Sequence, residues 1–173
     1  RHFRDKDELA RAVGDLILAP VVEGLPGGRS SWRTIVVEVC VRLRASLLAH
    51  PTLSAYVRAE PTRQPNELAI TEVLLAQFRR AGLDAAGSTA AYHAVISLTV
   101  GTATIDAGVA ERPDDQREEL YRQWRSTYAA LDPGVHPRSV ESAGQMWLGT
   151  ADERFRFALE ALLNGLVPPT ARR

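Results

Sequence analysis

The chain has 173 residues, of which 45% are hydrophobic and 24% are charged. This balance is typical of a globular domain with a sizeable core and excludes a disordered chain. The 21 basic residues are matched by 21 acidic ones, so the protein is not a uniformly basic nucleic-acid coat, although a local basic patch is compatible with this charge.

The N-terminal segment has the pattern of a helix. Asp5 followed by Glu8 forms a variant capping box and opens this helix. The spacing of its apolar residues predicts an inward face of Leu9, Val13, Leu16 and Ile17.

A long second helix is predicted after a Pro-Gly-Gly loop. Ser30 or Ser31 caps it, and His50 with Pro51 ends it. A run of valines also suggests a strand, but the apolar pattern continues for about seventeen residues, which is too long for a typical strand. A short helical segment is expected over residues 52–58. The inward stripe of the long helix is predicted to be Trp32, Ile35, Val36, Val39, Leu43 and Leu47.

Two further helices are separated by a glycine turn. Asn66 is expected to cap the first, and Gly82 suits the left-handed position after its end. Asp84 caps the second, which extends to about Gly108. Residues 85–105 carry no charge but are too polar for a membrane span, so we interpret this helix as buried. The inward residues of the first of these helices are predicted to be Leu68, Thr71, Leu75 and Phe78.

The C-terminal third continues the helical pattern. Pro113 begins a helix, residues 140–148 are weakly helical, and Thr150 followed by Glu153 is another variant capping box that opens a last helix. The inward stripe of the helix that begins at Pro113 is predicted to be Leu120, Trp124, Tyr128 and Leu131. That of the last helix is predicted to be Phe155, Leu159, Leu162 and Leu163. We therefore predict an all-α fold with about six substantial helices and one or two short ones.

Common catalytic and cofactor motifs are absent from the sequence. There is no phosphate-binding glycine loop and no nucleophile elbow, and none of the four histidines is spaced to share a metal with another. The single cysteine, Cys40, cannot form an intrachain disulfide and is expected to be a small core residue. We therefore predict no catalytic residue, no metal site and no cofactor.

Several residues fit either plain core packing or a small-molecule pocket. His93 lies in the long uncharged helix, one turn before Ser97, and is either a core histidine with a satisfied hydrogen bond or a polar group in an apolar pocket. The same two interpretations apply to four aromatic residues and one methionine, which are Tyr56, Trp124, Tyr128, Trp147 and Met146.

Small residues in the same helix would let another helix approach closely. They are Ala90, Ala91, Ala94, Ser97, Gly101 and Ala103. Close packing within the chain and the seam of a homodimer both fit this stripe.

Both ends of the chain, residues 1–9 (RHFRDKDEL) and residues 155–166 (FRFALEALLNGL), carry patterns of a known family. The first resembles the end of the helix-turn-helix and the start of the fourth helix in the TetR family of transcriptional regulators. The second is similar to the closing helix of the tetracycline-repressor-like subgroup. Between them, residues 32–51, 78–83 and 92–101 follow the helix order of that subgroup.

The resemblance implies an all-α, TetR-like ligand-binding and dimerisation domain over residues 5–173. Residues 1–4 would be the remnant of a helix-turn-helix domain, and the family's first three helices are expected to precede them. Homodimerisation is implied through helices at about residues 84–108 and 151–166. The dimer would place two recognition helices in successive major grooves of operator DNA.

The resemblance also implies roles for single residues. His2 and Lys6 match positions that contact DNA phosphates. An inducer bound among the central helices would swing the helix from Lys6 to about Ala19 and lower operator affinity. We expect an apolar or aromatic inducer, and the residues expected to contact it are Tyr56, His93, Ser97 and Trp124.

Metal-assisted recognition is not expected. The histidine with which the tetracycline repressor holds its magnesium-bound drug corresponds to Val57 here, so we predict neither a metal nor tetracycline. The overall expectation is a cytoplasmic repressor, without membrane attachment, that a small-molecule inducer releases from its operator. The alternatives are a dimeric helical small-molecule-binding protein without DNA-binding activity and an all-α enzyme with an unrecognised site.

Overall fold

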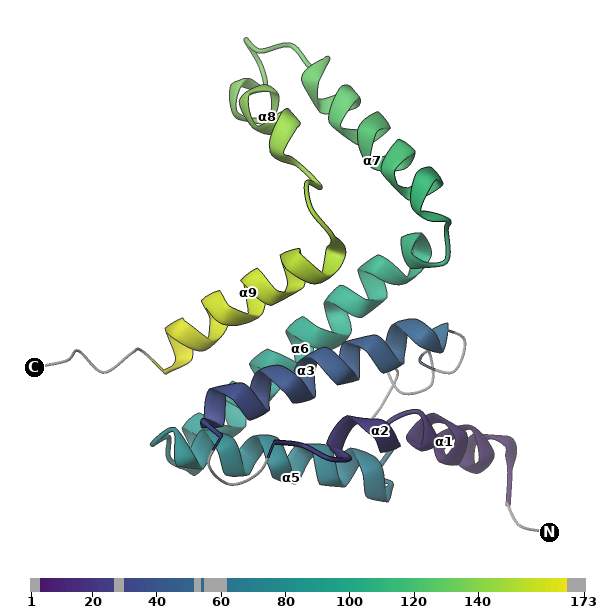
Figure 1. The fold of residues 1–173 in the computed structure, drawn as a ribbon, viewed down its shortest axis with the longest axis vertical. Coiled ribbons are helices and arrows are strands. Elements are labelled where there is room, and N and C mark those ends of the chain that lie inside the picture. Colours follow the sequence, from purple (N-terminus) through teal and green to yellow (C-terminus); the bar gives the residue numbers. More distant parts are fainter. Residues whose placement is uncertain (1–3, 27–29, 52–53, 55–61, 168–173) are drawn as a thin grey trace, which may run out of the picture.

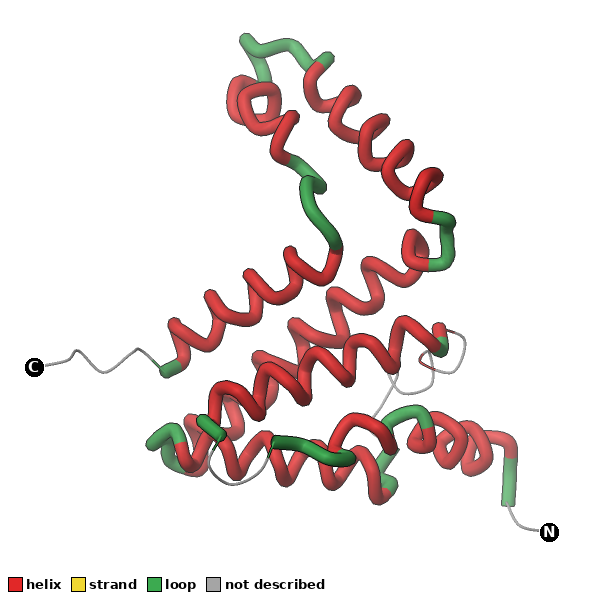
Figure 2. The backbone as a smooth tube through the Cα atoms, in the orientation of Figure 1, coloured by secondary structure: helices red, strands yellow, loops and turns green. Residues whose placement is uncertain are grey.

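The computed structural model describes residues 4–26, 30–51, 54 and 62–167. Over these residues the chain contains helices and no strand, which confirms the all-α prediction (Figure 2). The short helix expected over residues 52–58 lies almost entirely outside the described residues. The elements are α1 (Lys6–Leu16), α2 (Ala19–Val22), α3 (Trp32–Ala49), α5 (Pro65–Arg80), α6 (Ala85–Ala110), α7 (Asp114–Ala129), α8 (Pro137–Ser142), η1 (Ala143–Gln145) and α9 (Ala151–Leu166).

Three helices, α3, α5 and α6, pack against one another and form the centre of the molecule (Figure 1). The short α2 packs on α3 and α5, α1 packs on α5, and α9 lies along α6. The remaining elements, α7, α8 and η1, pack mainly on one another and extend away from the centre at the top of Figure 1. We call these three elements the arm.

The core fills the space between α3, α5, α6 and α9. The predicted inward stripes of α3 and α9 are confirmed almost completely, since only Trp32 and Leu162 are half-buried. Burial of each large apolar side chain contributes about 1.5–3 kcal/mol to folding. The most completely buried side chains include Val36, Val39, Cys40, Leu47, Leu74, Phe78, Val95, Leu159 and Leu163.

Four of the predicted N-terminal caps are confirmed. The side chains of Asp5, Ser31, Asp84 and Thr150 each accept a hydrogen bond from a backbone N–H three residues later, at distances of 2.7–3.1 Å. Each bond satisfies a donor that the first turn of a helix leaves without an intrahelical partner. Short-range capping patterns therefore set where these helices begin.

The start of α5 was predicted wrongly and its buried face only partly correctly, because Phe78 is buried as predicted and Leu68 is not. The helix begins at Pro65, not after Asn66, and Leu68 is 54% exposed. The apolar residues of α5 fit two stripes at helical spacing that meet at Phe78, and tertiary contacts select the one through Ile70 and Leu74. The residues of α5 that are buried are Ile70, Leu74, Gln77 and Phe78.

The predicted inward face of α1 is also partly wrong. Leu16 is 68% exposed and Leu9 is 43% exposed, whereas Ile17 is buried. The reason is that α1 makes extensive contact with only one of the described helices, α5, so only a narrow face of α1 is covered.

Contrary to the prediction of a buried helix, α6 has only one face covered. Its buried residues recur at three- and four-residue steps and are Ser88, Ala91, Val95, Thr99 and Ala103. The helix is long and apolar enough to cross a membrane by length and composition, yet only 17% of its most apolar window is buried. The uncovered side of α6 is thus an exposed apolar surface, a feature that marks interaction sites in many proteins.

Candidate functional site

A cavity of about 560 Å³ lies where α3, α6, α7 and α9 meet. This volume is in the range of small-molecule binding sites. Its lining combines apolar and charged side chains with the first residues of α9. The lining residues are Arg44, Leu48, Asp106, Val109, Ala110, Asp114, Arg117, Glu118, Tyr121, Gly149, Thr150, Ala151 and Asp152.

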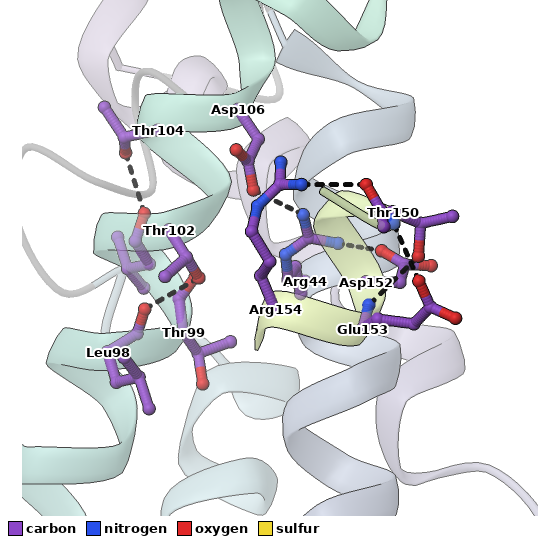
Figure 3. A network of polar contacts seen from close by, with 12 residues as sticks. Arg44, Leu98, Thr99, Thr102, Thr104, Asp106, Thr150, Asp152, Glu153 and Arg154 are labelled. Carbon is purple, nitrogen blue, oxygen red and sulfur yellow. Dashed lines mark hydrogen bonds and ion pairs between the residues drawn. The ribbon is translucent and has the colours of Figure 1, made fainter. Parts of the chain in front are cut away.

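Arg44 supplies a buried charge to this cavity. It lies on the inward side of α3 and is only 3% exposed. Its Nη2 donates to Asp106 Oδ2 at 2.6 Å, and its Nη1 pairs with Asp152, as Figure 3 shows. The guanidinium carbon also lies 5.2 Å from the centroid of the Phe155 ring. One cation thus joins α3 to α6 and α9.

The stability of this contact between α3, α6 and α9 depends on the two carboxylates that pair with Arg44. A buried ion pair offsets the loss of hydration only when its geometry is good and its remaining polar atoms are satisfied. Asp106, which carries the only charged side chain in α6, provides the better shielded carboxylate. The Nε atom of Arg44 has no hydrogen-bond partner among the described residues.

The start of α9 forms another wall of the cavity. Thr150 and Glu153 form a complete capping box, with bonds of 3.1 and 2.7 Å in the two directions. The hydrogen bond from the Thr150 N–H lowers the pKa of Glu153. Arg154 in turn donates to the Gly149 carbonyl at 2.9 Å and to the buried Tyr121 hydroxyl at 3.2 Å, which links α9 to the arm.

Each of the four carboxylates in the lining is paired with an arginine. Besides the two partners of Arg44, Asp114 pairs with Arg117, and Glu118 accepts from Arg125 at 2.6 Å. The cavity therefore offers donors and acceptors of hydrogen bonds together with one aromatic side chain, and its lining holds four acids and two arginines. No group of three His, Cys, Asp or Glu side chains in the described part of the chain is positioned to hold a metal ion.

The structure does not bring the predicted ligand-binding residues together. His93 and Ser97 lie on the exposed side of α6. Trp124 is half-buried in the arm, with its ring centroid 5.1 Å from that of Trp147. None of these three residues lines the cavity, and Tyr56 lies outside the described residues.

Sequence reasoning missed the residues that do line the cavity. Arg44 interrupts the apolar inward stripe of α3, and a charged residue at such a position indicates a buried ion pair. Asp106 stands alone in a helix that is otherwise free of charge. These two features single out both residues, but only the fold reveals that Asp152 joins them.

The predicted DNA-contacting residues lie at the N-terminal end. Lys6 is exposed at the start of α1, while His2 lies outside the described residues. Arg4, two residues before Lys6, donates a hydrogen bond from its backbone N–H to the Glu8 carboxylate at 2.6 Å. A cation at this end of α1 is accessible to a phosphate, and the DNA contact itself stays a prediction.

Large apolar side chains protrude from the uncovered side of α6 and α9. Ile105 on α6 is 76% exposed and Phe157 on α9 is 78% exposed. Small residues such as Ser97 accompany them on the exposed side of α6. A surface of this kind on two adjacent helices is typical of a protein–protein interface.

The single cysteine is not a reactive site. Cys40 is fully buried, and this burial raises the pKa of its thiol to about 12 because it disfavours the charged thiolate. At pH 8 the thiolate fraction is then about one in ten thousand.

We expect a thiol reagent such as DTNB not to label the folded chain at pH 8 and to label it fully in urea. Rapid labelling of the folded chain would show that Cys40 is accessible.

Comparison with known proteins places these features in a family. Residues 25–168 match the family described as the C-terminal domain of tetracycline-repressor-like proteins. An HTH-type transcriptional regulator of Saccharopolyspora erythraea is 29% identical over 106 residues, which make up 61% of this chain and 44% of that protein. The chain thus spans less than half the length of this curated relative.

Solved structures share the fold. A TetR transcriptional regulator from Streptomyces coelicolor superposes with a TM-score of 0.83 at 24% identity, covering 96% of this chain and 78% of that one. The TetR family protein ActR of Streptomyces coelicolor, in complex with actinorhodin, gives a TM-score of 0.80 at 24% identity over 95% of this chain and 77% of ActR. Apo ActR gives a TM-score of 0.78 at 25% identity over 94% and 74% of the two chains.

Proposed function

This chain belongs to the TetR family of transcriptional regulators, because residues 25–168 match the family's C-terminal domain, and we propose that it is the sensing and dimerising part of a cytoplasmic repressor. In this proposal a small molecule binds the domain and lowers the affinity of the whole regulator for its operator. The observation that carries it is the family match over most of the chain, supported by the shared fold of solved TetR regulators.

We propose a homodimer formed through α6 and α9. The exposed apolar side chains of Ile105 and Phe157 support this seam, because a monomer would leave them in water. The small residues on the uncovered side of α6 allow two helices to approach closely. His93 and Ser97 would then lie near the partner chain.

For the inducer we propose a small aromatic molecule that carries polar groups. The cavity beside Arg44 supports this class, since Tyr121 and Leu48 offer apolar contact and the paired acids and arginines offer hydrogen bonds. ActR, a protein of the same fold, is known in complex with actinorhodin. The contacts predicted earlier for Tyr56, His93, Ser97 and Trp124 remain proposals, and they would need a second binding region.

DNA binding belongs to the whole regulator. We propose that α1 connects this domain to DNA-binding helices of the regulator and that His2 and Lys6 contact operator phosphates. The exposed Leu9 and Leu16 on α1 support such a connection, because they provide an apolar face on which those helices can pack.

The proposal is tested by fluorescence anisotropy with the full-length regulator and labelled DNA from upstream of its gene. We expect a tight complex whose affinity falls about 5- to 150-fold when actinorhodin or a smaller aromatic probe is added. A non-aromatic sugar serves as the control and should leave the complex intact. Absence of DNA binding, or a complex that no aromatic probe weakens, would contradict the proposal.

A further inference from the structure

Asp15, near the end of α1, is a buried carboxylate with an unusual set of partners. It is 5% exposed. Its Oδ2 accepts from the Asn66 backbone N–H at 3.1 Å and from Asn66 Nδ2 at 2.9 Å. Its Oδ1 accepts from the Glu67 N–H at 3.0 Å and from the Thr62 hydroxyl at 3.3 Å. Every one of these donors belongs to the turn before α5 or to its first residues.

The Asp15 carboxylate caps α5 in place of a local residue. Gln64, at the N-cap position, makes no capping bond with its side chain. The N–H groups of Asn66 and Glu67 are those that an N-cap side chain ordinarily satisfies, and Asp15 reaches them from another helix. Its negative charge also lies at the positive end of the α5 dipole. The cap therefore doubles as a joint between α1 and α5.

This joint is the main attachment of α1. Apart from Asp15, the only buried residue of α1 is Gly14, so no large apolar side chain of that helix is buried. Asn66 Nδ2 adds a bond to the Asp15 backbone carbonyl at 3.1 Å. The Ser46 hydroxyl on α3 donates to the carbonyl of Ile17, just past the helix. The orientation of α1 is thus set by polar bonds, which are directional, more than by packing.

The turn that holds Asp15 is itself constrained. Thr62 is 2% exposed, and its hydroxyl also accepts from the Gln64 N–H at 3.3 Å. Arg63 has a left-handed backbone, with φ of 57°, and its N–H donates to Glu67 at 2.9 Å. These bonds therefore hold the donors around Asp15 in place.

We propose that Asp15 is the positioning residue that fixes the orientation of α1 against α5 and against the turn at residues 62–67. This inference rests on the proposed function, in which α1 leads to the DNA-binding helices. It assigns the attachment of α1 to the Asp15 carboxylate and to the four groups of Thr62, Asn66 and Glu67 that donate to it.

Hydrogen exchange of the 173-residue chain, followed by mass spectrometry, tests this role. Asp15→Asn keeps the size of the side chain but turns one acceptor into a donor that faces other donors. We expect amide exchange in α1 to rise about tenfold or more, with exchange in α3 and α6 unchanged. Asn66→Ala is a milder variant that removes only the two side-chain bonds of Asn66 and serves if Asp15→Asn folds poorly. We expect it to raise amide exchange in α1 by a smaller factor.

The matched control is Asp84→Ala, which removes the capping carboxylate of α6 and its 2.7 Å bond to Gly87. It should lower the melting temperature and leave exchange in α1 unchanged. Unchanged exchange of α1 in both Asp15→Asn and Asn66→Ala would overturn the proposal, as would an equal rise in all helices. Because this readout needs neither DNA nor ligand, its failure is distinct from a failure of the proposed function.

Discussion

Replacing Arg44 by methionine is expected to lower the free energy of unfolding by about 3 kcal/mol. The substitution keeps much of the apolar stem but removes both ion pairs. Asp106, whose side chain is 20% exposed, then lacks its cation in a largely dehydrated site. Asp152 is mostly in solvent and contributes less, which is why the expected loss is at the lower end for a broken buried pair.

Urea denaturation of the chain measures this loss, with two variants for comparison. Arg138→Met breaks the exposed pair with Glu141, and it should change the free energy of unfolding by less than about 0.5 kcal/mol. The double variant Arg44→Met with Asp106→Leu removes both charges and should recover most of the stability. A loss for Arg44→Met as small as that of Arg138→Met would show that the junction does not depend on this charge.

Replacing Phe157 by glutamate is expected to weaken the proposed homodimer about a hundredfold. Phe157 is a large aromatic side chain that protrudes from α9, and such residues commonly dominate interface energies. The glutamate would remove this contact and would also place a charge in a seam of apolar and small residues. The fold of the monomer should be unaffected, because the side chain is exposed within one chain.

Sedimentation velocity over a range of concentrations measures this change. The control is Val135→Glu, since Val135 is also highly exposed but lies beyond the end of α7, away from α6 and α9. We expect the control to remain dimeric and the Phe157 variant to sediment as a monomer at low micromolar concentration. Dimers of equal strength in both variants would exclude α9 as part of the seam, and a monomeric wild-type chain would exclude the homodimer.

Much of the fold could be predicted because the information is local. The caps at Asp5, Ser31, Asp84 and Thr150 act within one helical turn, and the stripes of α3 and α9 have a single consistent phase. The start of α5 could not be predicted in this way. Its cap comes from Asp15, 51 residues before Asn66, so no pattern near α5 indicates it.

The candidate site was less accessible to sequence reasoning. Arg44 and Asp152 are separated by 108 residues, and no short motif connects them. His93 and Ser97 lie on the exposed side of α6, although an inner position fits the sequence equally well because the whole helix is apolar. Such a helix gives no contrast between its faces, and the phase that packs on α3 and α5 is decided by the partners.

Footprinting of the full-length regulator on the DNA upstream of its own gene shows whether this domain belongs to a dimeric DNA-binding protein. A homodimer with two DNA-binding heads should protect two symmetry-related half-sites, with centres about 10 base pairs or a multiple of that apart. Phe157→Glu should weaken both half-sites together. A single protected half-site, or protection that this variant leaves unchanged, would contradict the dimeric arrangement, and no protected site would contradict a DNA-binding regulator.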